Sequence, residues 1–310
     1  MIYTLTLNTA VDMNIHCPPL QAAKVTRTES ARYFPNGKGV NVSVVLAHFG
    51  TKSTLLGFFG GFTGHYIVDT LSSQGLVVEP VWVEEPTRIN VFINDGTQEY
   101  KLVNPGSTIL AVAQQKLLTQ LHAITDMDYL VISGSLPQGI DESYYQHILD
   151  CCRQKQVEVI LDISHPSLKQ LLKYRPLLIK PNDDEVKEIF GLEIKNHPQA
   201  WRALKDMHAL GARNILLTLG SKGLYFSNGH QVLFCNAPDI RLVSSACAGD
   251  AALAAFLSQW LSARDLTHAL KLASATGADV AASEGLGELR RVESYFPQLK
   301  IEHLSEINYA

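Results

Sequence analysis

Short runs of β-branched and other apolar residues recur along the chain, and most of them are followed by a longer segment with helical periodicity. The apolar runs cover residues 53–58, 129–133, 157–163, 177–179 and 215–219, and the helical segments include 67–73, 144–155, 183–190 and 201–210. Strands that alternate with helices predict a mostly parallel sheet covered by helices on both faces. Such sheets bind ligands at the carboxyl ends of their strands.

Two regions break this alternation. Residues 9–35 contain no convincing helix, and residues 82–103 predict two strands, 88–93 and 98–103, around an Asp95-Gly96 turn. An Asp-Gly pair between alternating apolar residues indicates a β-hairpin. We expect both regions to form antiparallel strands that project from the α/β core. They could serve as a lid over the strand ends or as an ornament at the sheet edge.

Composition limits the classes of partner. The chain has 310 residues, of which 46% are hydrophobic and 18% charged, and its formal net charge is −4. This length suits one large α/β domain or two smaller ones with a sizeable core. No basic run predicts nucleic-acid or membrane-surface binding. Charged residues interrupt the Ala-rich stretch 246–282, so we do not expect it to span a membrane.

Cysteine usage and the first residues predict a cytoplasmic protein. The five cysteines have no metal-ligand spacing, and their odd number argues against a disulfide framework. They are Cys17, Cys151, Cys152, Cys235 and Cys247. We expect the first four to be small buried groups. The N-terminal segment reads as a strand and carries no basic leader.

The strongest local motif lies at residues 244–250, Ser-Ser-Ala-Cys-Ala-Gly-Asp, just before a helical run at 251–261. Small residues that enter a helix leave backbone N–H groups unpaired, and these groups form an anion site. Backbone amides around Cys247, Ala248 and Gly249 could therefore hold an anion such as a phosphate. Asp250 could accept the proton of an attacking hydroxyl. An isolated Gly-Asp pair would be read as an ordinary first-turn aspartate.

A second motif covers residues 36–43, Asn-Gly-Lys-Gly-Val-Asn-Val-Ser. Gly37 and Gly39 could let the backbone approach a ligand, to which Lys38 and Asn41 would supply polar contacts. The segment is not a P-loop, because it lacks the Gly-Lys-Ser/Thr sequence. Alone it is a weakly specific glycine-rich entrance to a helix.

Two further segments follow predicted strands. In residues 180–185, Asn182 and Glu185 share one face of a starting helix, where they could hold a hydrated Mg²⁺ or form a capping box; the two roles are compatible. Residues 218–223 could be a nucleotide-binding loop or a plain glycine turn. Asp12 and Arg88, taken singly, would be solvated surface charges.

Together these motifs resemble the PfkB (ribokinase-like) family of carbohydrate kinases. The resemblance covers Gly-x-Gly-x-Asn-x-Ser at 37–43 with Gly50 and Gly60, Asn182-x-x-Glu185, and the segment 244–257 around Gly-Asp. It extends over essentially the whole chain. It implies an α/β fold with a three-layer α/β/α core, a mostly parallel sheet and a small β-strand lid. The core would comprise residues 1–10, 36–85 and 108–310, and the lid residues 11–35 and 86–107.

Within the family, the chain is most similar to the 1-phosphofructokinase and tagatose-6-phosphate kinase branch, through residues 7–12, 37–42, 87–91, 133–137 and 180–182. The resemblance implies an ATP- and Mg²⁺-dependent kinase that converts a ketohexose monophosphate, fructose 1-phosphate in the first place, to a bisphosphate. The alternatives are tagatose 6-phosphate as substrate, or a catalytically weak sugar-phosphate sensor.

The resemblance also assigns roles to single residues. Asp12, Gly37, Lys38 and Asn41 would contact the sugar phosphate, Arg88 would grip its existing phosphate, and Asp250 would be the base. The nucleotide side would comprise Lys180, Asn182, Thr218, Gly220, Ser221, Gly223 and Ser274. Glu185 would reach the metal through water, next to Asn182.

Two residues depart from the family pattern. Gly or Ala is usual where this chain has Asn36, and Gly, Ala or Ser where it has Cys247. Asparagine tolerates a positive φ better than most residues. If position 247 needs a positive φ, its cysteine costs on the order of 1 kcal/mol or more. The exposed strands of a lid could also pair with a second copy of the chain, so a homodimer is compatible with the sequence.

Overall fold

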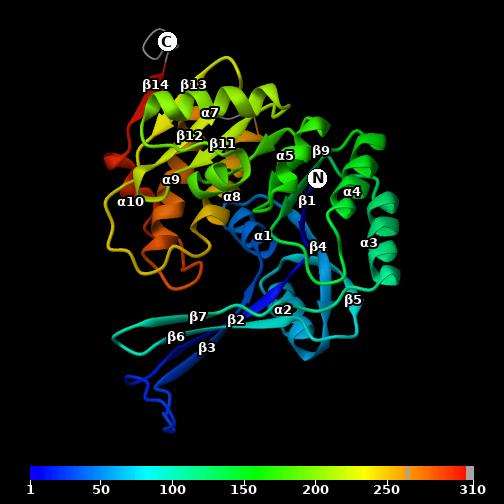
Figure 1. The fold of residues 1–310 in the computed structure, drawn as a ribbon, viewed down its shortest axis with the longest axis vertical. Helices are drawn as coiled ribbons and strands as arrows, with labels where there is room; N and C mark the ends of the chain where they lie inside the picture. The colour runs from blue at the N-terminus through cyan, green and yellow to red at the C-terminus, as the bar shows by residue number, and fades with distance from the viewer. Residues whose placement is uncertain (263–264, 305–310) are drawn as a thin grey trace.

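The computed structural model describes residues 1–262 and 265–304, and its largest feature is a ten-stranded sheet (Figure 1). In spatial order the strands are β14 (Ile301–Leu304), β13 (Val232–Cys235), β12 (Leu224–Ser227), β11 (Ile215–Thr218), β10 (Leu178–Ile179), β9 (Glu158–Asp162), β8 (Tyr129–Ser133), β1 (Ile2–Thr6), β4 (Ser53–Gly60) and β5 (Val77–Val83). The strands from β11 to β5 pair in parallel. Strands β12, β13 and β14 are antiparallel additions at one edge.

Helices cover both faces of this sheet. On one face lie α3 (Ala111–Ala123), α4 (Ser143–Gln154), α5 (Ser167–Leu171) and α7 (His197–Ala209). On the other lie α1 (Lys38–His48), α2 (Gly61–Ser73), α8 (Ala248–Trp260), α9 (Leu266–Ala281) and α10 (Val292–Tyr295). The side chains of β11 pack against both helical layers. Ile215 and Leu217 belong to the apolar cluster on one face of the sheet, and Leu216 belongs to the cluster on the other face. The predicted three-layer α/β/α arrangement is confirmed.

The predicted strands and helices are found at nearly the expected positions. Each of the five apolar runs contains a strand, and the segment 183–190 consists of α6 (Asp183–Glu185) followed by a π-helical turn (Val186–Phe190). Strands β5, β13 and β14 were missed. Of these, β5 is half-exposed and contains Pro80, which a sheet tolerates at an edge. Residues 82–83, assigned to the projecting region, belong to this strand.

A second sheet of four strands projects from the core, in the order β3 (Ser30–Asn36), β2 (Ala10–His16), β6 (Arg88–Asn94) and β7 (Glu99–Leu102) (Figure 1). The β6–β7 hairpin is confirmed: Asp95 Oδ1 accepts from the N–H of Thr97 (2.9 Å) and of Gln98 (2.7 Å). The expectation of purely antiparallel pairing was wrong, because β2 and β6 pair in parallel. These strands belong to separate chain excursions that leave the core in the same direction.

In the described part of the chain, no helix combines the length and apolarity needed to cross a bilayer. All five cysteines are free; Cys247 is partly exposed and the other four are buried.

Candidate active site

The Gly-Asp motif forms the first turn of α8. Cys247 is the N-cap residue, and its side chain makes no capping hydrogen bond. The N–H groups of a first helical turn have no intrahelical partner, so those of Ala248, Gly249 and Asp250 can bind an anion. Cys247 has a φ of +63° and a ψ of −11°, which is the left-handed conformation. The positive φ considered for this position is therefore real, and for a residue with a side chain it costs about 1–2 kcal/mol.

Asp250 is buried, with an exposed fraction of 6%, and Asn41 Nδ2 donates to its Oδ2 (2.9 Å). Burial raises the pKa of Asp250 to about 6, and the nearby Asp162 carboxylate adds to the increase. Lys38, Asn41 and Lys180 act in the opposite direction and limit it. A carboxyl with this pKa is ionised at neutral pH and still a better proton acceptor than an ordinary aspartate.

A buried carboxylate that the sequence analysis did not identify, Asp162, lies at the end of β9. Its Oδ1 is 3.0 Å from Lys180 Nζ and 3.3 Å from Lys38 Nζ, while its Oδ2 has no partner among the described residues. Burial on its own would raise the pKa of Asp162, but the two ammonium groups outweigh burial and hold it below its usual value. Lys38 also donates to Ser164 Oγ (2.9 Å).

Asp162 therefore orients the two lysines that reach the first turn of α8. A Cβ atom on Gly249 would lie 3.4 Å from Lys180 Nζ, which places that ammonium beside the proposed phosphoryl site. A lone aspartate at the end of an apolar run gives no sequence signal of such a contact. The position at the carboxyl end of a parallel strand was the only available hint.

Asn182 and Glu185 form the predicted capping box at the start of α6. Asn182 Oδ1 accepts from the Glu185 N–H (2.7 Å), and Glu185 Oε2 accepts from the Asn182 N–H (2.9 Å). Glu185 Oε1 accepts from Ser164 and lies 3.9 Å from Lys38 Nζ. Within the described residues, no group of three or more His, Cys, Asp or Glu side chains is placed to hold a metal ion directly. An amide oxygen and a carboxylate are ligand types that a hydrated Mg²⁺ accepts, and the contact of Asn182 and Glu185 with a metal stays a prediction.

Asp12 lies on β2, at the end of the second sheet nearest the core. Asn90 Nδ2 donates to its Oδ1 (2.8 Å), and Asn36 Nδ2 donates to its Oδ2. Burial raises the pKa of Asp12, and both amides and the charge of Arg88 oppose the increase. Asp12 is therefore a buried acceptor held from both sides, and not the solvated charge that its sequence position alone would indicate.

Arg88 is fixed by backbone carbonyls at the junction of the two sheets. Its Nη1 donates to Asn104 O (2.9 Å) and its Nη2 to Asn8 O (3.3 Å). Its Nε is buried and has no partner among the described residues. Burial lowers the pKa of Arg88, and Asp12 opposes that shift. Arg88 and Asp12 thus lie within electrostatic reach of each other, and their contact with a sugar phosphate stays a prediction.

The glycine motif at 36–43 joins β3 to α1. Gly37 has a φ of +133°, and a Cβ on Gly39 would approach Thr6 Cβ to 2.9 Å and Leu5 O to 3.0 Å. Gly39 is thus needed for packing α1 on β1, which is a different reason from the predicted approach to a ligand. Asn36 ends β3 and has no positive φ; that conformation falls on Gly37.

The predicted nucleotide loop follows β11. Thr218 forms an isolated parallel bridge with Asn182, and its N–H donates to Pro181 O (3.0 Å). Gly220 and Ser221 lie in the 3₁₀ turn Gly220–Lys222 that comes next. The two loops predicted to hold the nucleotide are therefore adjacent.

Gly223 ends this loop, and Ser274 lies on α9. A Cβ on Gly223 would come within 2.1 Å of Cys235 O and 2.8 Å of Asn236 Cα. The backbone of Gly223 therefore packs directly on the end of β13. Ser274 Oγ donates to Asn236 O (2.7 Å). Both residues therefore contact the chain around Asn236, and their contact with a nucleotide stays a prediction.

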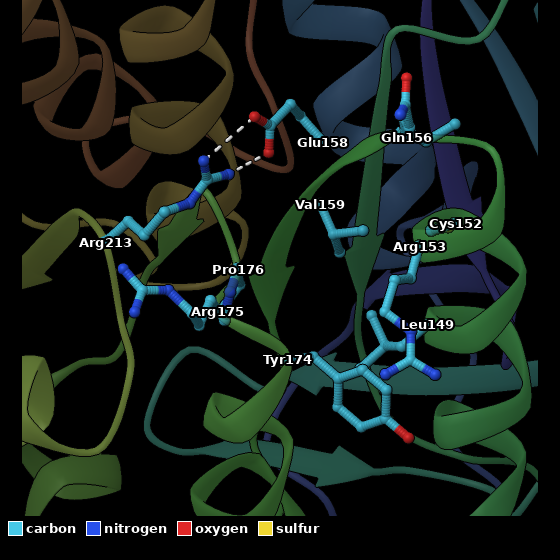
Figure 2. A pocket seen from close by; sticks show the side chains of 11 residues that line it. Leu149, Cys152, Arg153, Gln156, Glu158, Val159, Tyr174, Arg175, Pro176 and Arg213 are labelled. Atoms are coloured by element: carbon cyan, nitrogen blue, oxygen red, sulfur yellow. Dashed lines mark hydrogen bonds and ion pairs between the residues drawn. The ribbon is translucent and has the colours of Figure 1, made fainter.

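A separate pocket of about 320 Å³ lies at the opposite edge of the sheet (Figure 2). Glu158 begins β9, while Pro176 and Arg213 precede β10 and β11, so the pocket is at the amino ends of these strands. Figure 2 shows Arg213 paired with Glu158 by two interactions. None of the predicted site residues lines this pocket. It is not the site built by the sequence motifs of this chain.

A model of the pfkB family of carbohydrate kinases matches residues 6–291, so the chain belongs to this family. It is 57% identical to the D-tagatose-1-phosphate kinase of Klebsiella oxytoca, over 98% of this chain and all of that protein. It is 33% identical to the 1-phosphofructokinase of Bacillus subtilis, over 98% of this chain and all of that protein. The structure of phosphofructokinase-2 from Escherichia coli in complex with substrates and products superposes with a TM-score of 0.88 at 24% identity, covering 96% and 98% of the two chains.

Proposed function

We propose that this kinase transfers the γ-phosphoryl group of ATP to a primary hydroxyl of a ketohexose monophosphate, giving a bisphosphate and ADP. The observation that carries the proposal is the position of Asp250. It is a buried carboxyl with a pKa raised to about 6, in the first turn of an uncapped helix and beside the lysine cluster. A hydroxyl nucleophile needs such an acceptor next to the place where the phosphoryl group is stabilised.

The chain's own residues have separate parts in this reaction. Asp250 Oδ accepts the proton of the attacking hydroxyl, and the N–H groups of Ala248 and Gly249 stabilise the charge on the transferring group. Lys180 and Lys38, held by Asp162, neutralise phosphate oxygens. Mg²⁺, bound through water near Asn182 and Glu185, would supply further neutralisation of the nucleotide phosphates.

We favour D-tagatose 1-phosphate as the acceptor, with fructose 1-phosphate second. The first choice is supported by the identity of 57% with a relative named for that substrate, against 33% for the relative named 1-phosphofructokinase. In the sequence analysis fructose 1-phosphate came first. Both sugars present the same phosphate to Arg88 and hydroxyls to Asp12, so the chemistry of the site accommodates either.

Release of ADP from MgATP tests this proposal, with D-tagatose 1-phosphate, fructose 1-phosphate, tagatose 6-phosphate and fructose 6-phosphate offered in parallel. The Asp250→Asn variant is the control. We expect the highest kcat/KM with D-tagatose 1-phosphate and almost none in the control. Turnover of a 6-phosphate alone would refute the choice of a 1-phosphate as the acceptor. Saturable binding with no turnover of any of the four would identify a sensor.

We further propose that residues 11–35 and 86–107 form a lid that excludes water from the closed site. Residues 1–10, 36–85 and 108–310 would form the core, of which 263–264 and 305–310 lie outside the described residues. Unpaired outer edges on β3 and β7, with exposed Tyr33, Tyr100 and Leu102, support a homodimer through the lid. Light scattering at several protein concentrations tests the dimer, and a monomer at all of them would exclude it.

A cytoplasmic location fits the five free cysteines.

A further inference from the structure

Asn36 makes three side-chain hydrogen bonds at the point where the second sheet joins the core. It is the last residue of β3 and directly precedes Gly37, the N-cap residue of α1. Its Nδ2 donates to Asp12 Oδ2. Its Oδ1 accepts from the Gly37 N–H (2.6 Å) and from Asn41 Nδ2 (2.9 Å). Every polar atom of this side chain is therefore engaged.

The chemistry of the three partners fixes the orientation of the amide. A carboxylate can only accept a hydrogen bond and a backbone N–H can only donate one, so the nitrogen must face Asp12 and the oxygen must face Gly37. Asn41 must then turn its own nitrogen toward Asn36. No other rotation of the Asn36 amide satisfies these three groups. A side chain without an amide would leave all three without this partner.

These bonds link the proposed sugar site to the proposed base. The two hydrogens of Asn41 Nδ2 are divided between Asn36 Oδ1 and Asp250 Oδ2, both at 2.9 Å. A continuous path thus runs from Asp12 through Asn36 and Asn41 to Asp250. Asn41 is buried, with an exposed fraction of 2%, so water cannot readily replace a lost partner.

Asp12 is held by amides on both of its oxygens, since Asn90 donates to Oδ1 and Asn36 to Oδ2. An ionised carboxylate has about four acceptor positions, so the remaining ones can accept only from hydroxyl or N–H donors. The position of Asn36 therefore sets the direction in which Asp12 can meet the hydroxyls of a sugar. Epimeric sugars differ in the direction of one hydroxyl.

We propose that Asn36 is a positioning residue that aligns Asp12 for the sugar and Asn41 for Asp250, and so sets which ketohexose monophosphate is turned over. This inference rests on the proposed function. In this arrangement a hydroxyl of the preferred sugar donates to a remaining acceptor position of the Asp12 carboxylate. The hydrogen bond between Asn41 and Asp250 then stays intact. A sugar that displaces Asp12 pulls on Asn36 and disturbs the alignment of the base.

Two substitutions test the proposal. Asn36→Ala removes all three bonds, and Asn36→Asp keeps the shape while it turns a second carboxylate toward Asp12. Asn214→Ala is the matched control, because it removes an asparagine amide that donates to Leu177 O (2.7 Å) at the opposite edge of the sheet. For each variant, kcat and KM are measured from pH 5 to 9 with D-tagatose 1-phosphate and fructose 1-phosphate. Sugar binding is measured by calorimetry.

For Asn36→Ala we expect kcat/KM with the preferred sugar to fall about 10- to 100-fold, the effect of losing a hydrogen bond to a charged group. The ratio of kcat/KM between the two sugars should move toward one. The acidic limb of kcat should move to higher pH, since the Asn41 hydrogen bond that lowers the pKa of Asp250 is loosened. Asn36→Asp should lose at least as much activity, and Asn214→Ala should change neither the ratio nor the limb.

An equal loss on both sugars with an unmoved acidic limb would show a purely structural role and overturn the proposal. Near-normal kinetics would do the same. If Asn36→Ala fails to fold, the near-isosteric Asn36→Asp is used instead to measure the ratio of kcat/KM between the two sugars and the acidic limb of the pH profile of kcat. Failure of the proposed function is a separate result, because then the unmodified protein turns over neither sugar.

Discussion

Replacing Asp250 with asparagine should abolish most of the activity and at the same time stabilise the protein at neutral pH. The substitution removes the ionisable group and keeps an oxygen that can accept from Asn41, whose Nδ2 lies 2.9 Å away. Loss of a general base lowers turnover by about 10²- to 10⁴-fold. The gain in stability arises because burial makes the ionised carboxylate unfavourable in the folded protein.

The size of that gain follows from the pKa. Folding moves the carboxyl of Asp250 from its ordinary value of 3.8 to about 6. Each pKa unit corresponds to 1.36 kcal/mol, so ionisation disfavours the fold by about 3 kcal/mol at pH 8. Because the folded state binds this proton more tightly, the cost is absent below the unfolded pKa and grows as the pH rises through the folded one. At pH 5 it should be about half as large.

Urea denaturation at pH 5 and pH 8 measures this difference, and ADP release measures turnover. We expect the variant to be more stable by about 3 kcal/mol at pH 8, since the pKa of about 6 already includes the attraction of the neighbouring lysines. Asp206→Asn, which changes an exposed carboxylate on α7, is the control and should show neither effect. A variant that is destabilised at pH 8, or that turns over near the normal rate, would refute the reasoning.

Three other substitutions give separable outcomes. Arg88→Ala should raise KM for the sugar phosphate by about 10-fold or more with little change in kcat. An unchanged KM in steady-state kinetics would show that Arg88 does not bind the substrate. Cys247→Gly should stabilise the protein by up to about 1 kcal/mol in urea denaturation, because glycine adopts a φ of +63° without strain; a loss of stability would mean that the cysteine is not strained. Lys180→Met breaks a 3.0 Å pair with buried Asp162 and should cost about 3–5 kcal/mol near neutral pH. That cost should shrink as acid protonates Asp162, whose pKa is held low, and a pH-independent cost would contradict the pairing.

Local patterns were enough to predict the layered fold. The apolar runs around Ile160 and Leu216 are buried on both faces, which is the pattern of parallel central strands. The edge strand β5 was missed because its residues are half-exposed and Pro80 interrupts it. The parallel pairing of β2 with β6 could not be predicted, because it depends on how two distant excursions leave the core.

The sequence also marked the motif residues as candidates for the site. It did not mark the residues that hold them in place. Asp250, Asn182 and Glu185 lie in helix entrances with recognisable spacing. Asp162 has no neighbour in the chain that marks it, and its contact with Lys38 spans 124 residues. Asn36 was examined only for its backbone conformation, but its importance in the structure comes from its side-chain amide.

The bond between Asn41 and Asp250 joins residues that are 209 positions apart. A ribosome makes the two in that order, so a growing chain carries the glycine motif long before it carries the base. Lys38, Asp162 and Lys180 all precede α8 and can assemble earlier. Incomplete chains that end before α8 would therefore be able to bring together the two lysines proposed to bind phosphate, but they would lack the proposed base.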